Sequence, residues 1–215
     1  MASPLTLKQR FHTGKLINQV RLPNNSNKEQ VQAAINESNC ELIYIDAQHG
    51  PITEWDVVRI CSAAEELNVP VQMRIKHLKE SYLIGHYLDI GLFGIKVPEV
   101  KKVETVKEAV NAFYFPPFGQ RSWGGWVGYG IQGRRDRIQY AQWWNQNGVL
   151  GFKIESIKAV LDIRELVIPG VDYVDFGPSD LSFDLETNPH PHLQSVEDCK
   201  AFVKKELEGV DVRIL

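Results

Sequence analysis

The sequence predicts an α/β protein whose parallel strands form a (β/α)8 barrel. Short runs rich in β-branched residues alternate with segments whose apolar residues recur every three or four positions, which is typical of βαβ units. No GxGxxG pattern follows the first run, which weighs against the competing open, dinucleotide-binding sheet. The expected strands are residues 15–20, 41–46, 71–75, 94–97, 149–154, 171–176 and 210–215.

Helices are expected between these strands, over residues 27–38, 52–67 and 103–113. Thr53 precedes an acidic first turn that contains Asp56, a pattern that predicts an N-terminal helix cap. Residues 1–215 contain no linker or low-complexity segment, so we expect a single domain. The seventh run reaches Leu215, and we therefore expect a barrel that lacks its eighth strand and last helices.

The amino-acid composition argues against proteins that bind nucleic acids or membranes. A hydrophobic content of 43% is enough for a substantial core, and a formal charge of −3 favours neither a nucleic-acid backbone nor an anionic membrane. The first residues lack the apolar centre of a signal peptide, and no apolar run is long enough to cross a membrane. Three widely spaced cysteines argue against a zinc ribbon or a disulfide framework, so we expect a cytoplasmic protein.

Ionisable residues gather where the expected strands end. Glu155 and Asp180 follow consecutive strands, so in a barrel their carboxylates lie side by side at its mouth. Two carboxylates with open positions suit a hard divalent ion such as Mg²⁺ or Mn²⁺, and Co²⁺ is a further option. A pair of helix caps, or one salt bridge, is the alternative interpretation of the same pattern.

Three further residues are candidates for catalysis. His49 follows the second strand in the segment DAQHGP and is placed to act as a general base, although a lone histidine is more often structural. Arg74 ends the third strand and is suited to bind a carboxylate or an oxyanion, or to pair with Asp46 or Glu155. Asp89 is placed either to orient His49 or to cap a helix end.

Residues 115–137 form an unusual segment with six glycines, two tryptophans and two prolines. Long loops are uncommon unless they are functional or disordered, and the aromatic residues argue against simple disorder. We interpret the segment as a rim that closes over a ligand. A rim that packs against a neighbouring subunit fits the same composition equally well.

Six motifs in their order along the chain carry a resemblance to a known family. They are IDAQHGP, QMRIK, LDIGLFGIKVPEV, YFPPFGQRS, FKIES and VDYVDFGPSDLS. From about residue 10 onward the chain resembles the HpcH/HpaI aldolases, which are metal-dependent 2-oxo acid aldolases and include 2-keto-3-deoxy sugar-acid aldolases. It is also similar to macrophomate synthase.

The resemblance implies a role for each candidate residue. Glu155 and Asp180 would hold the divalent metal, and Arg74 would bind the 2-oxo acid and steady its enolate. His49 would act in proton transfer with Asp89 as its partner. The turn formed by Gly177, Ser179 and Asp180 would offer backbone N–H groups to the substrate carboxylate. The family also implies a homo-oligomer, and no Schiff-base lysine is needed.

The expected activity is a class II lyase that makes or cleaves a C–C bond between a pyruvate-type enolate and an aldehyde. One alternative is a macrophomate-synthase-like enzyme that decarboxylates oxaloacetate and passes the enolate to another acceptor. A second alternative is a non-catalytic relative that binds a 2-oxo acid or a protein partner. Gln48 and Lys153 depart from common family residues, and the tryptophan-rich loop points to a bulkier or more apolar acceptor than a sugar aldehyde.

Overall fold

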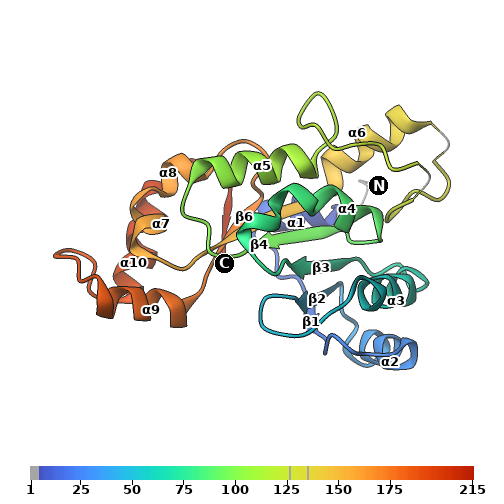
Figure 1. Ribbon diagram of the computed structural model, residues 1–215, viewed down its shortest axis with the longest axis horizontal. Coiled ribbons are helices and arrows are strands. Elements are labelled where there is room, and N and C mark those ends of the chain that lie inside the picture. The colour runs from blue at the N-terminus through green and yellow to red at the C-terminus, as the bar shows by residue number, and fades with distance from the viewer. Residues whose placement is uncertain (1–4, 126, 135) are drawn as a thin grey trace.

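The computed structural model describes residues 5–125, 127–134 and 136–215, and shows one curled parallel sheet with helices around it (Figure 1). Strand order follows chain order from β1 to β7. The strands are β1 (Gln19–Arg21), β2 (Leu42–Asp46), β3 (Val71–Arg74), β4 (Gly94–Val97), β5 (Val149–Ile154), β6 (Tyr173–Phe176) and β7 (Arg213–Ile214). Within the described ranges, no ladder joins β7 to β1, so the sheet is an open, barrel-like curl.

Helix α1 precedes β1, and the other helices connect successive strands, as parallel pairing requires. They are α1 (Leu7–His12), α2 (Lys28–Ser38), α3 (Glu54–Glu65), the 3₁₀ helix η1 (Leu78–Leu83), α4 (Ile84–Asp89), α5 (Val103–Phe113), α6 (Arg137–Asn147), α7 (Ile157–Leu161), α8 (Ile163–Leu166), α9 (Pro178–Thr187) and α10 (Val196–Glu206). The predicted helices 27–38, 52–67 and 103–113 are confirmed as α2, α3 and α5. Thr53 and Asp56 form the expected capping box.

The two outer strands are shorter than the sequence predicted. The expected strand 15–20 pairs only over Gln19–Arg21, and the expected strand 210–215 only over Arg213–Ile214. Before β1, the chain is held by α1 instead of by the sheet, because Lys15 N–H donates to Arg10 O and Arg10 Nη2 donates to Leu16 O. Each outer strand also has a neighbour on one side only, so fewer hydrogen bonds define its length.

The inner strands are buried on both faces. All five residues of β2 and all four of β3 and β4 are buried, because helices cover the outside and side chains fill the inside. The three cysteines are free and buried, as expected of small apolar residues.

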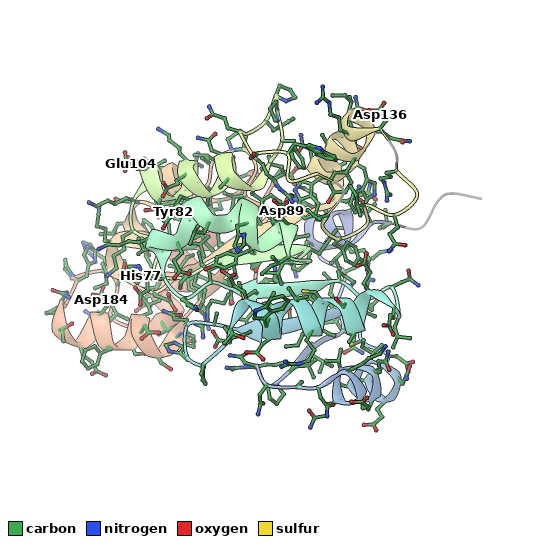
Figure 2. All side chains as sticks on the ribbon, turned by 45° about the vertical axis from the view of Figure 1, so that its right-hand side comes forward. His77, Tyr82, Asp89, Glu104, Asp136 and Asp184 are labelled. Carbon is green, nitrogen blue, oxygen red and sulfur yellow. The ribbon has the colours of Figure 1, made fainter. Side chains whose placement is uncertain are left out.

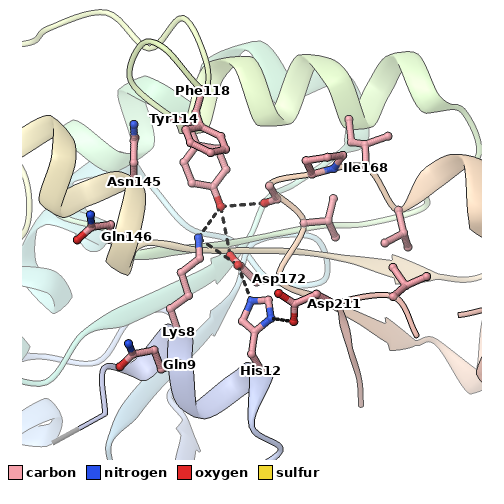
Figure 3. Close-up of a pocket in the computed structure, with 15 residues that line it drawn as sticks. Lys8, Gln9, His12, Tyr114, Phe118, Asn145, Gln146, Ile168, Asp172 and Asp211 are labelled. Atoms are coloured by element: carbon pink, nitrogen blue, oxygen red, sulfur yellow. Dashed lines mark hydrogen bonds and ion pairs between the residues drawn. The ribbon is translucent and has the colours of Figure 1, made fainter. Parts of the chain in front are cut away.

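Helix α1 closes the end of the curl where the strands begin, and Asp172 anchors it there (Figure 3). Asp172 Oδ1 lies 3.1 Å from Lys8 Nζ and 3.0 Å from His12 Nε2, both on α1. Its Oδ2 accepts from the backbone N–H of Leu150 at 2.8 Å. The hydrogen bond with Asp172 outweighs partial burial and raises the pKa of His12. One buried carboxylate therefore ties α1 to the start of β5 and β6.

Candidate active site at the strand ends

Arg74 and Asp46 meet because parallel pairing of β2 with β3 places them opposite each other. Arg74 Nε donates to Asp46 Oδ1 at 2.7 Å, and Arg74 Nη2 bonds to Asp46 Oδ2. Burial is the largest single influence on the Asp46 carboxyl and raises its pKa. The hydrogen bonds and charge of Arg74, the N–H of Gln48 and the charge of Arg21 together outweigh burial and lower the pKa. The remaining Nη1 of Arg74 lies 3.9 Å from Glu155 Oε1. The guanidinium is thus fixed by Asp46 and directed toward Glu155.

Glu155 follows β5 and is 5% exposed. Its Oε2 accepts a 2.6 Å hydrogen bond from the N–H of Glu99, whose backbone adopts the left-handed conformation with φ 52°. Its Oε1 is buried and has no hydrogen-bond partner within the described parts of the chain. Burial is the largest cause and raises the pKa of this carboxyl. The charge of Asp180 adds to it, against the opposing N–H of Glu99 and the charges of Lys153 and Arg74. One oxygen of a buried acid is therefore left for a cation.

Asp180 stands in the first turn of α9, directly after β6. Helix geometry leaves the N–H groups of this turn, including those of Ser179 and Asp180, without acceptors inside the helix. The N–H of Gly177 is different, since it donates to Ile154 O at 2.9 Å. Gly177 instead provides space, because a Cβ there would lie 2.4 Å from Cγ of Glu155. This close approach brings the two carboxylate-bearing strand ends together.

A divalent cation fits this pair of carboxylates. The orphaned Oε1 of Glu155 is buried, and the neighbouring Asp180 adds negative charge that is exposed to solvent. The described residues contain no cluster of three or more His, Cys, Asp or Glu side chains that could hold a metal. Any metal at Glu155 and Asp180 would therefore keep several positions open, as oxygen-ligated Mg²⁺ commonly does.

The structure places His49 and Asp89 in different surroundings. His49 is exposed in the bend that follows β2. Asp89 ends α4 (Figure 2), and its Oδ1 lies 2.6 Å from Nη2 of Arg121. The Arg121 guanidinium is buried between the rings of Phe115 and Trp144, at 4.7 and 4.6 Å from their centroids. The role of Asp89 as the partner of His49 stays a prediction.

Lys96, Lys153 and Asp175 form a charged cluster inside the curled sheet, and the sequence did not predict this grouping. Lys96 Nζ lies 2.6 Å from Asp175 Oδ2 and 4.8 Å from the ring centroid of Tyr44. Lys153 Nζ lies 3.6 Å from the same Asp175 oxygen and donates to Phe176 O at 3.3 Å. The ammonium of Lys153 is thus held by Asp175. The available sequence signal was a set of charged residues inside otherwise apolar strand runs.

Gln48 is the second residue that differs from the common family residue at its position. It binds Glu99, which also binds Glu155. Gln48 Nε2 donates to Glu99 Oε1 at 3.0 Å, while the N–H of Glu99 holds Glu155. Glu99 Oε2 also lies 3.9 Å from Nε2 of His77, which Figure 2 labels. An amide at position 48 can donate to a carboxylate, whereas a second carboxylate would repel it.

Trp123 and Tyr129 of the predicted rim pack against other aromatic side chains. Trp123 packs near Phe115 and Tyr140, with ring centroids 6.0 and 5.8 Å away, and Tyr129 lies edge-on to Phe93 at 5.2 Å. Trp126 and Arg135 of the rim lie outside the described residues, as do residues 1–4 of the N-terminal stretch. This packing gives Trp123 a structural role, and the prediction of an apolar acceptor stays a prediction.

Comparison with known proteins identifies relatives. The sequence model of the HpcH/HpaI aldolase/citrate lyase family matches residues 15–206. A 2-keto-3-deoxy-L-rhamnonate aldolase from Escherichia coli O9:H4 (strain HS) is 30% identical over 164 residues, which span 74% of this chain and 60% of the relative. A 2-dehydro-3,6-dideoxy-6-sulfogluconate aldolase from Pseudomonas putida is 27% identical over 176 residues, 76% of this chain and 64% of the relative. The chain thus spans less than two thirds of these relatives.

A solved structure shows the same fold. The HpcH/HpaI aldolase from Desulfitobacterium hafniense DCB-2 superposes with a TM-score of 0.83 at 28% identity, over 98% of this chain and 81% of that one. Macrophomate synthase superposes with a TM-score of 0.75 at 22% identity, over 98% and 75%, which supports the fold alone. Within the described ranges, no helix is both long and apolar enough to span a membrane.

Proposed function

Because the chain belongs to the HpcH/HpaI aldolase/citrate lyase family, we propose that it supplies the active site of a divalent-metal-dependent aldolase. The reaction makes or cleaves a C–C bond between the enolate of a pyruvate-type 2-oxo acid and an aldehyde. The observation that carries this proposal is the buried Oε1 of Glu155, which accepts no hydrogen bond from the described residues. It lies 3.9 Å from Arg74 Nη1 and close enough to Asp180 to feel its charge.

Each residue has a task in this proposal. Glu155 and Asp180 hold Mg²⁺ or Mn²⁺, with Co²⁺ as a further option. A bound divalent ion supplies Lewis acidity toward the 2-oxo acid and lowers the cost of enolate formation. Arg74 holds the developing oxyanion with a guanidinium that Asp46 has already oriented. Ser179 and Asp180 offer first-turn N–H groups to the substrate carboxylate.

His49 moves the proton. Its exposed imidazole stands in the bend after β2, on the strand-end side of the sheet, and histidine is the side chain that most often serves as a general base. In the cleavage direction, the base takes a proton from the hydroxyl of the aldol, and the electron pair of the broken C–C bond becomes the enolate. In the synthetic direction, the proton returns to the new alkoxide.

The wider setting is part of the proposal. We propose that the seven strands form part of a (β/α)8 barrel and that the protein is a homo-oligomer. Its partners are small-molecule substrates, with no nucleic acid or membrane among them. The three free, buried cysteines support a reducing cytoplasm as its location. An oxaloacetate decarboxylase that passes its enolate to another acceptor needs the same arginine and metal pair, and differs only in how the enolate arises.

Exchange of the pyruvate methyl protons in D₂O, followed by NMR, tests the proposal without knowledge of the aldehyde. We expect exchange with Mg²⁺ or Mn²⁺ that stops on addition of EDTA. Glu155→Gln removes the charge of the buried oxygen and should abolish exchange, whereas Glu186→Gln, an exposed change on α9, should leave it intact. A folded, metal-loaded protein without exchange would refute the pyruvate aldolase assignment and favour a non-catalytic relative.

A further inference from the structure

Two lysines and one aspartate lie inside the curled sheet, next to the carboxylates proposed to hold the metal. Strand pairing places Lys153 of β5 opposite Asp175 of β6. Lys153 stands two residues before Glu155, which directly follows the strand, so the alternation of side chains directs both to the same face of the sheet. The position of this ammonium therefore affects whether a cation can bind Glu155.

The carboxylate and the backbone of β6 hold the ammonium of Lys153. Lys153 Nζ lies 3.6 Å from Asp175 Oδ2 and donates to the backbone oxygen of Phe176 at 3.3 Å. Oε1 of Glu155 accepts no hydrogen bond from the described residues, so the ammonium does not occupy it. Phe176 directly precedes Gly177, where an added Cβ would lie 2.4 Å from Cγ of Glu155. The flexible stem of the lysine thus ends one residue away from the position that touches Glu155.

Lys96 fixes Asp175 from the other side. Lys96 Nζ lies 2.6 Å from Asp175 Oδ2 and 4.8 Å from the ring centroid of Tyr44. The Lys96 side chain is 9% exposed, and burial lowers the pKa of its ammonium although the charge of Asp175 opposes this. A buried ammonium needs a counter-charge, so Asp175 cannot turn to solvent without leaving Lys96 unpaired. Asp175 is therefore a rigid support for Lys153.

Lys153 and a divalent cation would compete for the same oxygen. Burial has the largest effect on the Glu155 carboxyl and raises its pKa, while the charge of Lys153 opposes the rise, so the two groups already interact. An ammonium at Oε1 would supply the hydrogen bond that this oxygen lacks, and it would repel a second positive charge there. The oxygen stays open to a metal only while Lys153 stays on Asp175.

We propose that Asp175 is a positioning residue, which restrains Lys153 and so keeps Oε1 of Glu155 free for a divalent cation. The inference rests on the proposed function, because that function places the metal at Glu155 and Asp180. Asp175 touches neither metal nor substrate and acts through Lys153. A lysine at position 153 is then compatible with metal binding, because the strand register places a carboxylate opposite it.

Mn²⁺ affinity, measured by electron paramagnetic resonance as the loss of the free-ion signal, tests this role. We expect Asp175→Asn to weaken Mn²⁺ binding about 10–100-fold, the worth of one charged hydrogen bond, because the released ammonium occupies Glu155. Combining Asp175→Asn with Lys153→Gln should return Kd to within about threefold of the wild type, because the two positions are coupled. Asp175→Glu keeps the counter-charge and should retain the wild-type affinity.

A matched control is available in Asp172→Asn. Asp172 is also a buried carboxylate that pairs with a lysine, but it lies at the opposite end of β6. Its loss should leave the Mn²⁺ affinity unchanged. Equal affinity of the wild type and Asp175→Asn, an equal loss in Asp172→Asn, or a loss that Lys153→Gln does not restore would overturn the inference.

Lys153→Gln alone gives a check that keeps Asp175 and its bond to Lys96. We expect this variant to bind Mn²⁺ at least as tightly as the wild type, because it removes a positive charge beside the site. Weaker binding would show that the lysine supports the metal site and would overturn the inference.

The position of the ammonium is a readout that needs no metal. A crystal structure of metal-free Asp175→Asn should show Lys153 Nζ within hydrogen-bonding distance of Glu155 Oε1, and an ammonium that stays on Phe176 O would overturn the inference. A wild type that binds Mn²⁺ as expected and does not exchange the pyruvate methyl protons would refute the aldolase proposal alone. Absence of Mn²⁺ binding in both the wild type and Lys153→Gln would refute the metal site and the inference together.

Discussion

The substitution Asp172→Asn should lower the free energy of unfolding and leave the catalytic activity of the folded protein unchanged. Asp172 is buried at the amino-terminal ends of the strands (Figure 3), opposite the face where barrel enzymes place their active sites. The substitution keeps the size of the side chain, but it replaces one acceptor oxygen by an amide that donates. Either the contacts from Lys8 and His12 at Oδ1 or the bond from Leu150 N–H at Oδ2 must then be lost.

The expected cost follows from these partners. A hydrogen bond to a charged group contributes about 1.5–3 kcal/mol. The side chains of Lys8 and His12 are 17% and 22% exposed, so water replaces part of what they lose. We expect the free energy of unfolding to fall by about 2–4 kcal/mol, and Tm by roughly 5–15 °C for a chain of this size. Pyruvate exchange per folded molecule should be unchanged.

Urea unfolding followed by circular dichroism measures this change. Asp211→Asn is the matched control, because Asp211 also contacts His12, at 2.7 Å, but is 90% exposed. An exposed pair of this kind contributes at most about 1 kcal/mol. A loss for Asp172→Asn below about 1 kcal/mol, or equal to that of the control, would refute the view that one buried carboxylate anchors α1.

Two further outcomes are expected. Because the folded-state pKa of His12 is raised, its stabilising contact should be fully present below about pH 6.5 and lost as pH rises through that raised pKa. The Tm difference between wild type and His12→Gln should therefore shrink from pH 5.5 to 9, and a constant or growing difference would contradict this. Gly177→Ala should cost about 1–3 kcal/mol in urea unfolding and weaken Mn²⁺ binding, because the new Cβ collides with Glu155. Gly85→Ala, whose Cβ would approach other atoms no closer than 3.3 Å, is its control, and equal effects would contradict the packing argument.

The sequence predicted those site residues whose position follows from their chemistry and from their place at the end of a strand. Arg74 and Glu155 were expected at strand ends, and both are there. The position of Asp180 in the first turn of a helix also follows from local features, since Gly177 and Pro178 end the strand and open α9. These predictions depended on contacts within a few residues, which a single sequence displays directly.

The partners of these side chains were not predictable. Arg74 and Asp46 are 28 residues apart, and the sequence left open whether Arg74 binds a ligand or pairs with Asp46 or Glu155. The structure shows both contacts, with Asp46 as the near one. For Asp89 the sequence left a role beside His49 and a helix cap open, and it did not indicate the hydrogen bond that Asp89 accepts from Arg121. Strand register and helix packing decide such pairs, and neither is written in a local pattern.

The sequence by itself determined the parallel α/β class, the strand positions and the set of charged residues at the strand ends, because burial and local geometry select residue types along each element. Only the tertiary structure decided which charges neutralise one another. In the folded chain Lys153 pairs with Asp175, and Oε1 of Glu155 accepts no hydrogen bond from the described residues. Arg21 and Arg74 both bond to the carboxylate of Asp46. Electrostatic interactions depend on distances between atoms brought together by folding, so the reactive charges emerge only when the sheet has curled.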